Sequence, residues 1–197
     1  MVTLNIFIFS FATLRADIEL SVANIFSARF SREAVMAIQP VPVPTSRREF
    51  AFPLAFKRSI RSSVSALSVA KENMKIFNIT NVQMSVHNFL HNRFKSKFDV
   101  VVSNPPYISV DDMSFLPKEV KDYDPPSALT DNADGLSFYR RFAEQFDNLL
   151  IPGGVLLLEF GGNSQKYDIE KIFNGAGLKT EFFKDLQKKW RVVEVYR

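Results

Sequence analysis

Cysteine is absent from this sequence of 197 residues. Disulfide bonds and thiolate-bound metal sites are therefore excluded, and the composition fits a reducing compartment. We expect the cytoplasm, with the mitochondrial matrix as the alternative. Long hydrophobic runs are also missing: residues 1–14 are apolar but too short to cross a bilayer, and they lack the basic start of a secretory signal. No membrane partner is expected.

Glycine is scarce and unevenly placed. All seven glycines lie at or after Gly135. A nucleotide-like cofactor usually needs a glycine-rich turn, because only glycine lets the backbone approach the ligand so closely. The first two thirds of the chain contain no such turn.

The rest of the composition is ordinary for a globular domain. Hydrophobic residues make up 46% and charged residues 23%, and the length suffices for one domain with a sizeable core. The net charge of +4 weakly favours acidic partners, such as RNA or a ribosome-associated protein.

One stretch organises the chain. The β-branched run Val100–Val102 predicts a buried parallel strand, and it ends in Asn104-Pro105-Pro106-Tyr107. Each proline restricts the residue before it to extended backbone, and neither has an N–H to donate. The pattern predicts a stiff turn at the carboxyl end of a strand, where open α/β sheets bind their ligands.

This turn has a specific chemistry to offer. The Asn104 side-chain oxygen and the Pro105 carbonyl are both acceptors, so together they can bind both hydrogens of a planar NH2 group. They would orient an amide or a base amine for attack on an electrophile, and Tyr107 would supply a ring to stack on the same plane. An ordinary proline-rich loop is the alternative interpretation.

Periodicity predicts the remaining elements. Residues 1–60 are expected to be irregular or poorly ordered, with an extended, proline-bearing linker near residue 40. Ser109–Leu129 reads as a long polar loop, and Pro152-Gly153-Gly154 as a turn. Helices are expected at 66–73, 136–150 and 167–174, the last closed by Gly175 or Gly177, and strands at 82–86, 100–102, 155–158, 182–183 and 192–195.

His87 and His91 are spaced like two ligands on one helix face. No third ligand candidate lies near them in the sequence, so we interpret them as solvated side chains and predict no metal site.

The order of motifs then resembles a known family. The matching segments are Asn104-Pro105-Pro106-Tyr107, Leu116-Pro117-Lys118-Glu119-Val120, Tyr123-Asp124-Pro125, Ala128-Leu129, Asp134-Gly135-Leu136-Ser137-Phe138-Tyr139-Arg140, Pro152-Gly153-Gly154, Leu158-Glu159-Phe160-Gly161, Gln165, Asp185-Leu186 and Arg191-Val192-Val193. From about Ala66 to the C-terminus, the chain resembles the HemK/PrmC release factor glutamine methyltransferases.

The resemblance implies a fold and a reaction. The fold would be α/β, a Rossmann-like class I sheet dependent on S-adenosylmethionine (SAM), occupying residues 61–197 and truncated at its first strand, turn and helix. The reaction would be methylation of the glutamine amide in the Gly-Gly-Gln loop of a release factor, the expected partner. Arg61 stands where relatives carry the aspartate that binds the SAM ribose.

The resemblance also assigns roles to residues. Asn104, Pro105 and Tyr107 would be catalytic. Substrate would be bound by these three with Pro106 and Glu119, and SAM by Asn88 and Asn104.

Two alternatives stay open. An adenine-specific nucleic-acid methyltransferase uses the same turn on a flipped base, which makes nucleic acid a secondary candidate partner. The other is a catalytically inactive fragment or a mis-assembled gene model, because the glycine-rich turn is missing.

Overall fold

The computed structural model describes residues 6–10, 71–72, 75–76, 86–122 and 124–197. Its named elements, in chain order, are β1 (Ile6–Ser10), β2 (Phe98–Asn104), the 3-10 helix η1 (Asp112–Phe115), α5 (Lys118–Lys121), α6 (Pro126–Leu129), α7 (Ser137–Leu149), β3 (Leu150–Glu159), α8 (Asn163–Gly175), β4 (Lys179–Lys184) and β5 (Trp190–Tyr196).

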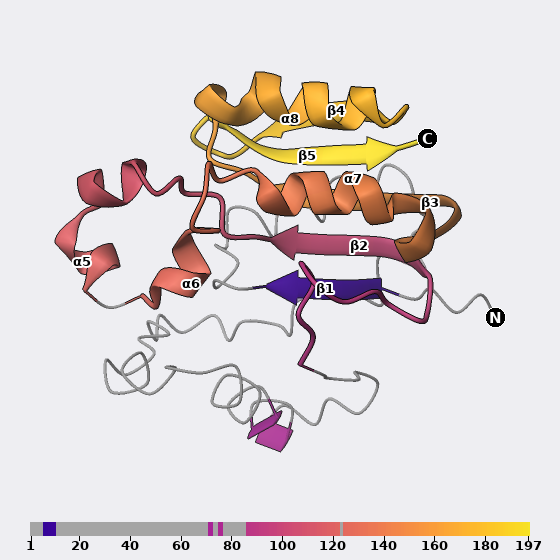
Figure 1. Ribbon diagram of the computed structural model, residues 1–197, viewed down its shortest axis with the longest axis horizontal. Helices are drawn as coiled ribbons and strands as arrows, with labels where there is room; N and C mark the ends of the chain where they lie inside the picture. Colours follow the sequence, from indigo (N-terminus) through magenta and orange to yellow (C-terminus); the bar gives the residue numbers. More distant parts are fainter. Residues whose placement is uncertain (1–5, 11–70, 73–74, 77–85, 123) are drawn as a thin grey trace.

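The strands form one mixed sheet in the order β1-β2-β3-β5-β4 (Figure 1). β1, β2 and β3 run parallel, whereas β5 runs antiparallel to both β3 and β4. The α/β class, the parallel strand that carries the proline turn and the closing antiparallel hairpin are as the sequence predicts.

The first strand departs from the sequence expectation. Residues 1–60 were expected to be irregular or poorly ordered, but Ile6–Ser10 forms a strand that pairs along β2, with Ile6 opposite Val100 and Ser10 opposite Asn104. The IFIFS run is rich in β-branched and aromatic residues, which favour a strand once a sheet edge offers unpaired backbone groups. A strand therefore occupies the position beside β2 where the sequence predicted none, while the turn and helix expected to be missing after it fall outside the described residues. Arg61, the linker, all but the last residue of the strand expected at 82–86 and most of the helix expected at 66–73 lie outside the described residues.

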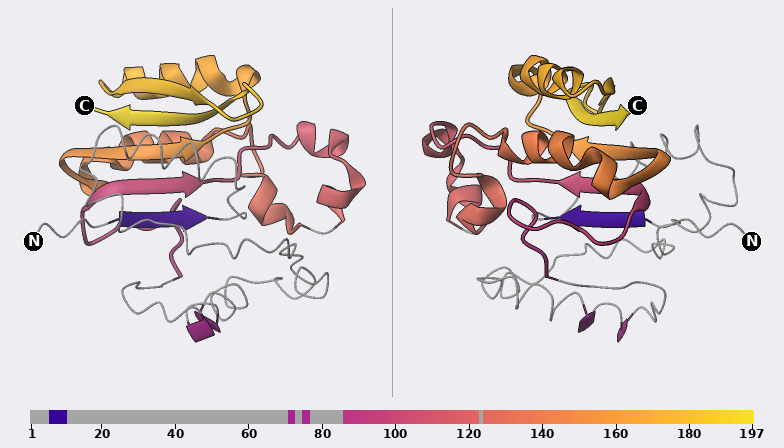
Figure 2. Two further views of the ribbon diagram at one scale, coloured as in Figure 1. Left: turned by 180° about the vertical axis from the view of Figure 1, so that it is seen from behind. Right: turned by 45° about the vertical axis from the view of Figure 1, so that its right-hand side comes forward.

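Helices α7 and α8 lie side by side on one face of the sheet (Figures 1 and 2). The inward side chains of α7 are those expected from its amphipathic pattern, and all are buried: Phe138, Phe142, Phe146 and Leu149. They share a core with one face of the sheet, to which Val101, Leu156, Leu158, Val193 and Val195 contribute. This core sets β2 and β3 rigidly beside each other.

Three boundaries differ from the predicted ones. The Pro152-Gly153-Gly154 turn is an irregularity inside β3, where pairing to β2 jumps from Leu150 to Val155. Helix α8 begins four residues early, at Asn163, and Gly177, with a φ of 71°, follows its end. The expected loop contains η1, α5 and α6, because prolines fix the backbone φ at helix starts, as at Pro126.

Segment Ser109–Leu129, called the arm below, extends beyond the carboxyl ends of β1 and β2 (Figure 1). Its base is closed by a bridge between Ile108 and Thr130 and by a 2.9 Å hydrogen bond from the Ile108 N–H to the Leu129 carbonyl. In the ranges described, no helix is both long and apolar enough to cross a membrane.

Candidate functional site

The predicted turn follows β2, with its first residue in the sheet. Asn104 ends β2 opposite Ser10 and is 5% exposed, and both prolines after it are buried. Among the described residues, its side-chain amide takes part in no hydrogen bond. The amide oxygen is therefore available to accept one from a ligand that reaches the carboxyl end of the strand.

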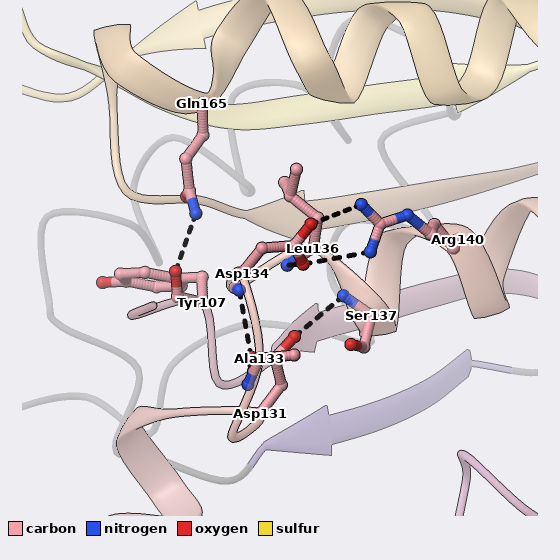
Figure 3. Close-up of polar contacts among 9 residues, drawn as sticks. Tyr107, Asp131, Ala133, Asp134, Leu136, Ser137, Arg140 and Gln165 are labelled. Carbon is pink, nitrogen blue, oxygen red and sulfur yellow. Dashed lines mark hydrogen bonds and ion pairs between the residues drawn. The ribbon is translucent and has the colours of Figure 1, made fainter. Parts of the chain in front are cut away.

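Tyr107, at the other end of the turn, is held by its neighbours. Its hydroxyl donates to Glu159 Oε1 at 3.2 Å. Its carbonyl accepts from Gln165 Nε2 at 2.7 Å, as Figure 3 shows. Its ring is partly buried and packs against the hydrophobic core. The structure thus adds two hydrogen bonds that fix Tyr107, which the sequence predicted only as a ring for stacking.

Gln165 bridges two loops at this edge. Its Oε1 accepts from the Gly161 N–H at 2.9 Å while its Nε2 binds the Tyr107 carbonyl. The approach needs glycine: a Cβ at Gly161 would stand 2.7 Å from Gln165 Oε1, and one at Gly135 would meet the Tyr107 carbonyl oxygen. The sequence supplied Gln165 only as one residue of a resemblance, and its contact with Tyr107 was not foreseen.

Asp131 organises the segment that leads from the arm into α7. Its carboxylate accepts from the N–H groups of Ala133, Gly135 and Ser137 at 2.9, 3.0 and 2.9 Å (Figure 3). Burial alone would raise the pKa of Asp131, but hydrogen bonds from Ser137, Ala133 and Gly135 lower it below the ordinary value. Sequence reasoning missed this residue, although an aspartate before a turn and a helix start is a recognisable signal.

Arg140 fastens the same segment to α7. Its guanidinium binds the Asp134 carboxylate through two hydrogen bonds, of 3.0 and 2.5 Å. The Arg140 hydrogen bond lowers the pKa of Asp134. The pair is half exposed, so it contributes little to stability and mainly fixes orientation.

A buried pair lies beneath Tyr107. Glu159, at the end of β3, is buried, and its backbone carbonyl accepts from the Tyr139 hydroxyl at 2.6 Å. Burial, together with the charges of Tyr107, Glu159 and Asp131, raises the pKa of Tyr139 well above its ordinary value. Tyr139 therefore stays a neutral donor that fixes the strand end on which Tyr107 rests.

Two predicted site residues lie apart from this cluster. Glu119 is in α5 of the arm, and its side chain lies outside the described residues. Asn88 is exposed, and its backbone carbonyl accepts from the N–H groups of His91 and Asn92. Among the described residues, no hydrogen bond or ion pair joins Asn88 to the Asn104–Tyr107 turn.

The histidines are not equally solvated. His87 stacks on Phe94 with ring centroids 3.9 Å apart, and its Nε2 is buried without a hydrogen bond in this part of the chain. It was expected to be solvated, but the apolar face of the imidazole packs on an aromatic ring. Among the described residues, no cluster of three or more histidines or carboxylates could hold a metal ion.

The residues that would receive SAM are described only in part. Asn88 presents an exposed amide that can accept from an amine, and Asn104 stands where the carboxyl ends of β1 and β2 meet. Both side chains carry an amide oxygen, the kind of acceptor that would hold the adenine amine of SAM.

Known proteins match most of the chain. The family model for the Eco57I restriction-modification methylase matches residues 28–158, and so begins before the domain start expected at residue 61. A bifunctional methyltransferase of Rickettsia felis is 38% identical over 133 residues, which are 66% of this chain and 25% of that protein. The release factor glutamine methyltransferase of Bacillus subtilis is 34% identical over 167 residues, 79% of this chain and 57% of that protein.

Solved structures overlap with the chain only partly. A release factor-specific protein-(glutamine-N5) methyltransferase of Alicyclobacillus acidocaldarius is 30% identical, covers 51% of this chain and 49% of its own, and has a TM-score of 0.34. The chain spans between 25% and 57% of the length of the two curated relatives above. With two thirds of its residues inside the family match, the chain belongs to the Eco57I-type methylase family. Together with its curated relatives, this match identifies it as a HemK/PrmC-like methyltransferase.

Proposed function

We propose that this chain methylates the side-chain amide nitrogen of the glutamine in the Gly-Gly-Gln loop of peptide chain release factors, with SAM as the methyl donor. The observation that carries the proposal is the Asn104 amide. It is buried at the end of a parallel strand, next to two prolines whose backbones can accept hydrogen bonds but not donate them. Among the described residues, none forms a hydrogen bond with this amide. The name of the curated relative from Bacillus subtilis, a release factor glutamine methyltransferase, supports the same substrate.

The turn addresses the difficulty of this reaction. An amide nitrogen is a poor nucleophile because its lone pair is delocalised into its own carbonyl. Asn104 Oδ1 and the Pro105 carbonyl would accept its two hydrogens, aim the nitrogen and stabilise the positive charge that develops on it. When bound, SAM supplies an electrophilic methyl group on a positively charged sulfur.

Other residues would complete the site. Pro106 keeps the turn stiff, Tyr107 covers one side of the bound amide, and Glu119 on the arm would contact the protein substrate. Asn88 would accept from the adenine amine of SAM. These assignments follow the family motifs residue by residue, and each can be tested by substitution.

Transfer of a labelled methyl group from SAM tests the proposal. The full chain would be mixed with a release factor that carries Gly-Gly-Gln, and with the same factor carrying Gly-Gly-Ala. We expect label in the first protein alone. Asn104→Ala should reduce transfer by about tenfold or more, because it removes one of two hydrogen bonds to the reacting amide. Asn148→Ala, at an exposed position of α7, is the matched control and should leave transfer unchanged.

Adenine methylation is the second candidate, favoured by the restriction-modification name of the matching family model. Adenine-containing DNA and RNA would therefore be included in the assay. Label in nucleic acid alone, lost in Asn104→Ala, would replace the glutamine substrate by adenine. An absence of transfer, combined with no calorimetric signal for SAM binding, would support the inactive fragment.

A further inference from the structure

We propose that Gln165 is a positioning residue for the Asn104–Tyr107 turn. Its carboxamide, together with the Tyr107 carbonyl and the Gly161 N–H, is called the clasp below. This role deepens the proposed function and rests on it, since the acceptors being positioned are those that would bind the substrate amide.

The clasp uses both ends of one carboxamide. Gln165 lies in the first turn of α8, and its Nε2 and Oε1 lie 2.7 Å from the Tyr107 carbonyl oxygen and 2.9 Å from the Gly161 nitrogen, respectively. A shorter or a charged side chain cannot supply a donor and an acceptor at this reach.

The turn needs support from other segments because its own backbone can form few hydrogen bonds. Pro105 and Pro106 have no N–H, so neither can donate a backbone hydrogen bond across the turn. Its first residue is fixed by the pairing of β2 with β1. Its last residue, Tyr107, is fixed from α8 and β3. Where Tyr107 sits determines where the stiff proline pair ends, and so where the Pro105 carbonyl points.

The clasp is itself braced from the closing hairpin. The backbones of Phe160 and Arg191 are joined by a 3.0 Å hydrogen bond from the Phe160 N–H, and Arg191 Nη1 donates to the Phe160 carbonyl at 3.4 Å. Arg191 also pairs with Asp185 at 3.5 Å. Phe160 is therefore held in place by β5, and this fixes the position of Gly161, which donates to Gln165.

A pH profile separates positioning from general support. In Gln165→Glu, the ionised carboxylate faces the Tyr107 carbonyl with no hydrogen to donate, whereas the protonated form has an O–H that restores the bond. We expect the affinity of Gln165→Glu for a Gly-Gly-Gln release factor peptide to be about tenfold below that of the unaltered chain at alkaline pH. Affinity should return as the pH falls through the carboxyl pKa. Gln165→Ala should stay weak throughout, and Gln187→Glu, which adds the same charge at an exposed turn, should match the unaltered chain.

Hydrogen exchange of the full chain tests the clasp without the peptide. In Gln165→Ala and Gln165→Glu, the amides of residues 107–110 should exchange faster, with β3 and β5 unchanged. The proposal would be overturned if exchange at 107–110 equalled that of the unaltered chain, or if faster exchange spread over the whole sheet. It would also be overturned if the peptide affinity of Gln165→Ala recovered at low pH as that of Gln165→Glu should. If the unaltered chain binds no peptide, the proposed substrate fails, and the exchange result alone then decides the clasp.

Discussion

The body of the protein, made of the sheet with α7 and α8, and the arm differ in where their side chains lie. The body buries a continuous cluster of aromatic and aliphatic residues, and Phe142 within it is 1% exposed. The arm has no buried residue in η1, and its Phe115 is 84% exposed. Most of the buried apolar surface therefore lies in the body, and the exposed residues of η1 can meet a partner without disturbing that core.

The largest expected effect comes from removing a ring from the body. Phe142 packs against Phe89 with ring centroids 4.4 Å apart. Phe142→Ala should lower the free energy of unfolding by about 3–5 kcal/mol, because it leaves a cavity between α7 and the sheet. Urea denaturation measures this loss. A loss below about 1 kcal/mol would show that the core is looser than its burial indicates.

The second largest loss of stability is expected in residues 131–137, the seam that joins the arm to α7 of the body. Gly135 has a φ of 79°, and a Cβ there would meet the Tyr107 carbonyl oxygen. Gly135→Ala should therefore cost about 1–3 kcal/mol. Gly175, at the end of α8, has nothing within 4 Å of an added Cβ, so Gly175→Ala is the control and should be neutral or slightly stabilising. If both substitutions changed the thermal unfolding temperature equally, the close contact between Gly135 and the Tyr107 carbonyl would not contribute to stability.

Acid should weaken the same seam. Hydrogen bonds from Ser137, Ala133 and Gly135 hold the pKa of Asp131 below its ordinary value in the folded chain, so the stability it contributes is present above the unfolded-state pKa and is lost as the pH falls through the folded pKa. Asp131→Asn keeps an acceptor but loses the charge and should cost about 1 kcal/mol at neutral pH. Chemical denaturation from neutral pH to about pH 3 should show the difference between the two proteins shrinking. A constant difference would mean that the carboxylate charge contributes nothing.

The smallest effect is expected in the arm. Phe115→Ala should change the unfolding free energy by less than about 0.5 kcal/mol, because the ring is already in solvent. Measuring Phe115→Ala and Phe142→Ala in the same urea titration compares directly how much a ring of the arm and a ring of the body contribute to stability. A loss of about 2 kcal/mol or more would show that the arm packs on the body in solution.

Local signals were readable from the sequence, and distant pairings were not. The strand before Asn104 and the buried face of α7 were predicted because their periods of two and 3.6 are local properties. The contact between Gln165 and Tyr107 joins residues 58 apart, and β1 pairs with residues even further along the chain, so no local pattern specifies either. Prolines at helix starts were interpreted as loop signals, which concealed the short helices of the arm.

The closed base of the arm has a consequence for the length of this segment. Because Ile108 and Thr130 are already adjacent, residues added between them need only close a somewhat larger loop. Doubling the length of a flexible loop costs only about 0.6 kcal/mol in closure entropy. Insertions or a grafted recognition segment in the arm should therefore leave the sheet folded, which makes it the natural place to redesign which partner the turn meets.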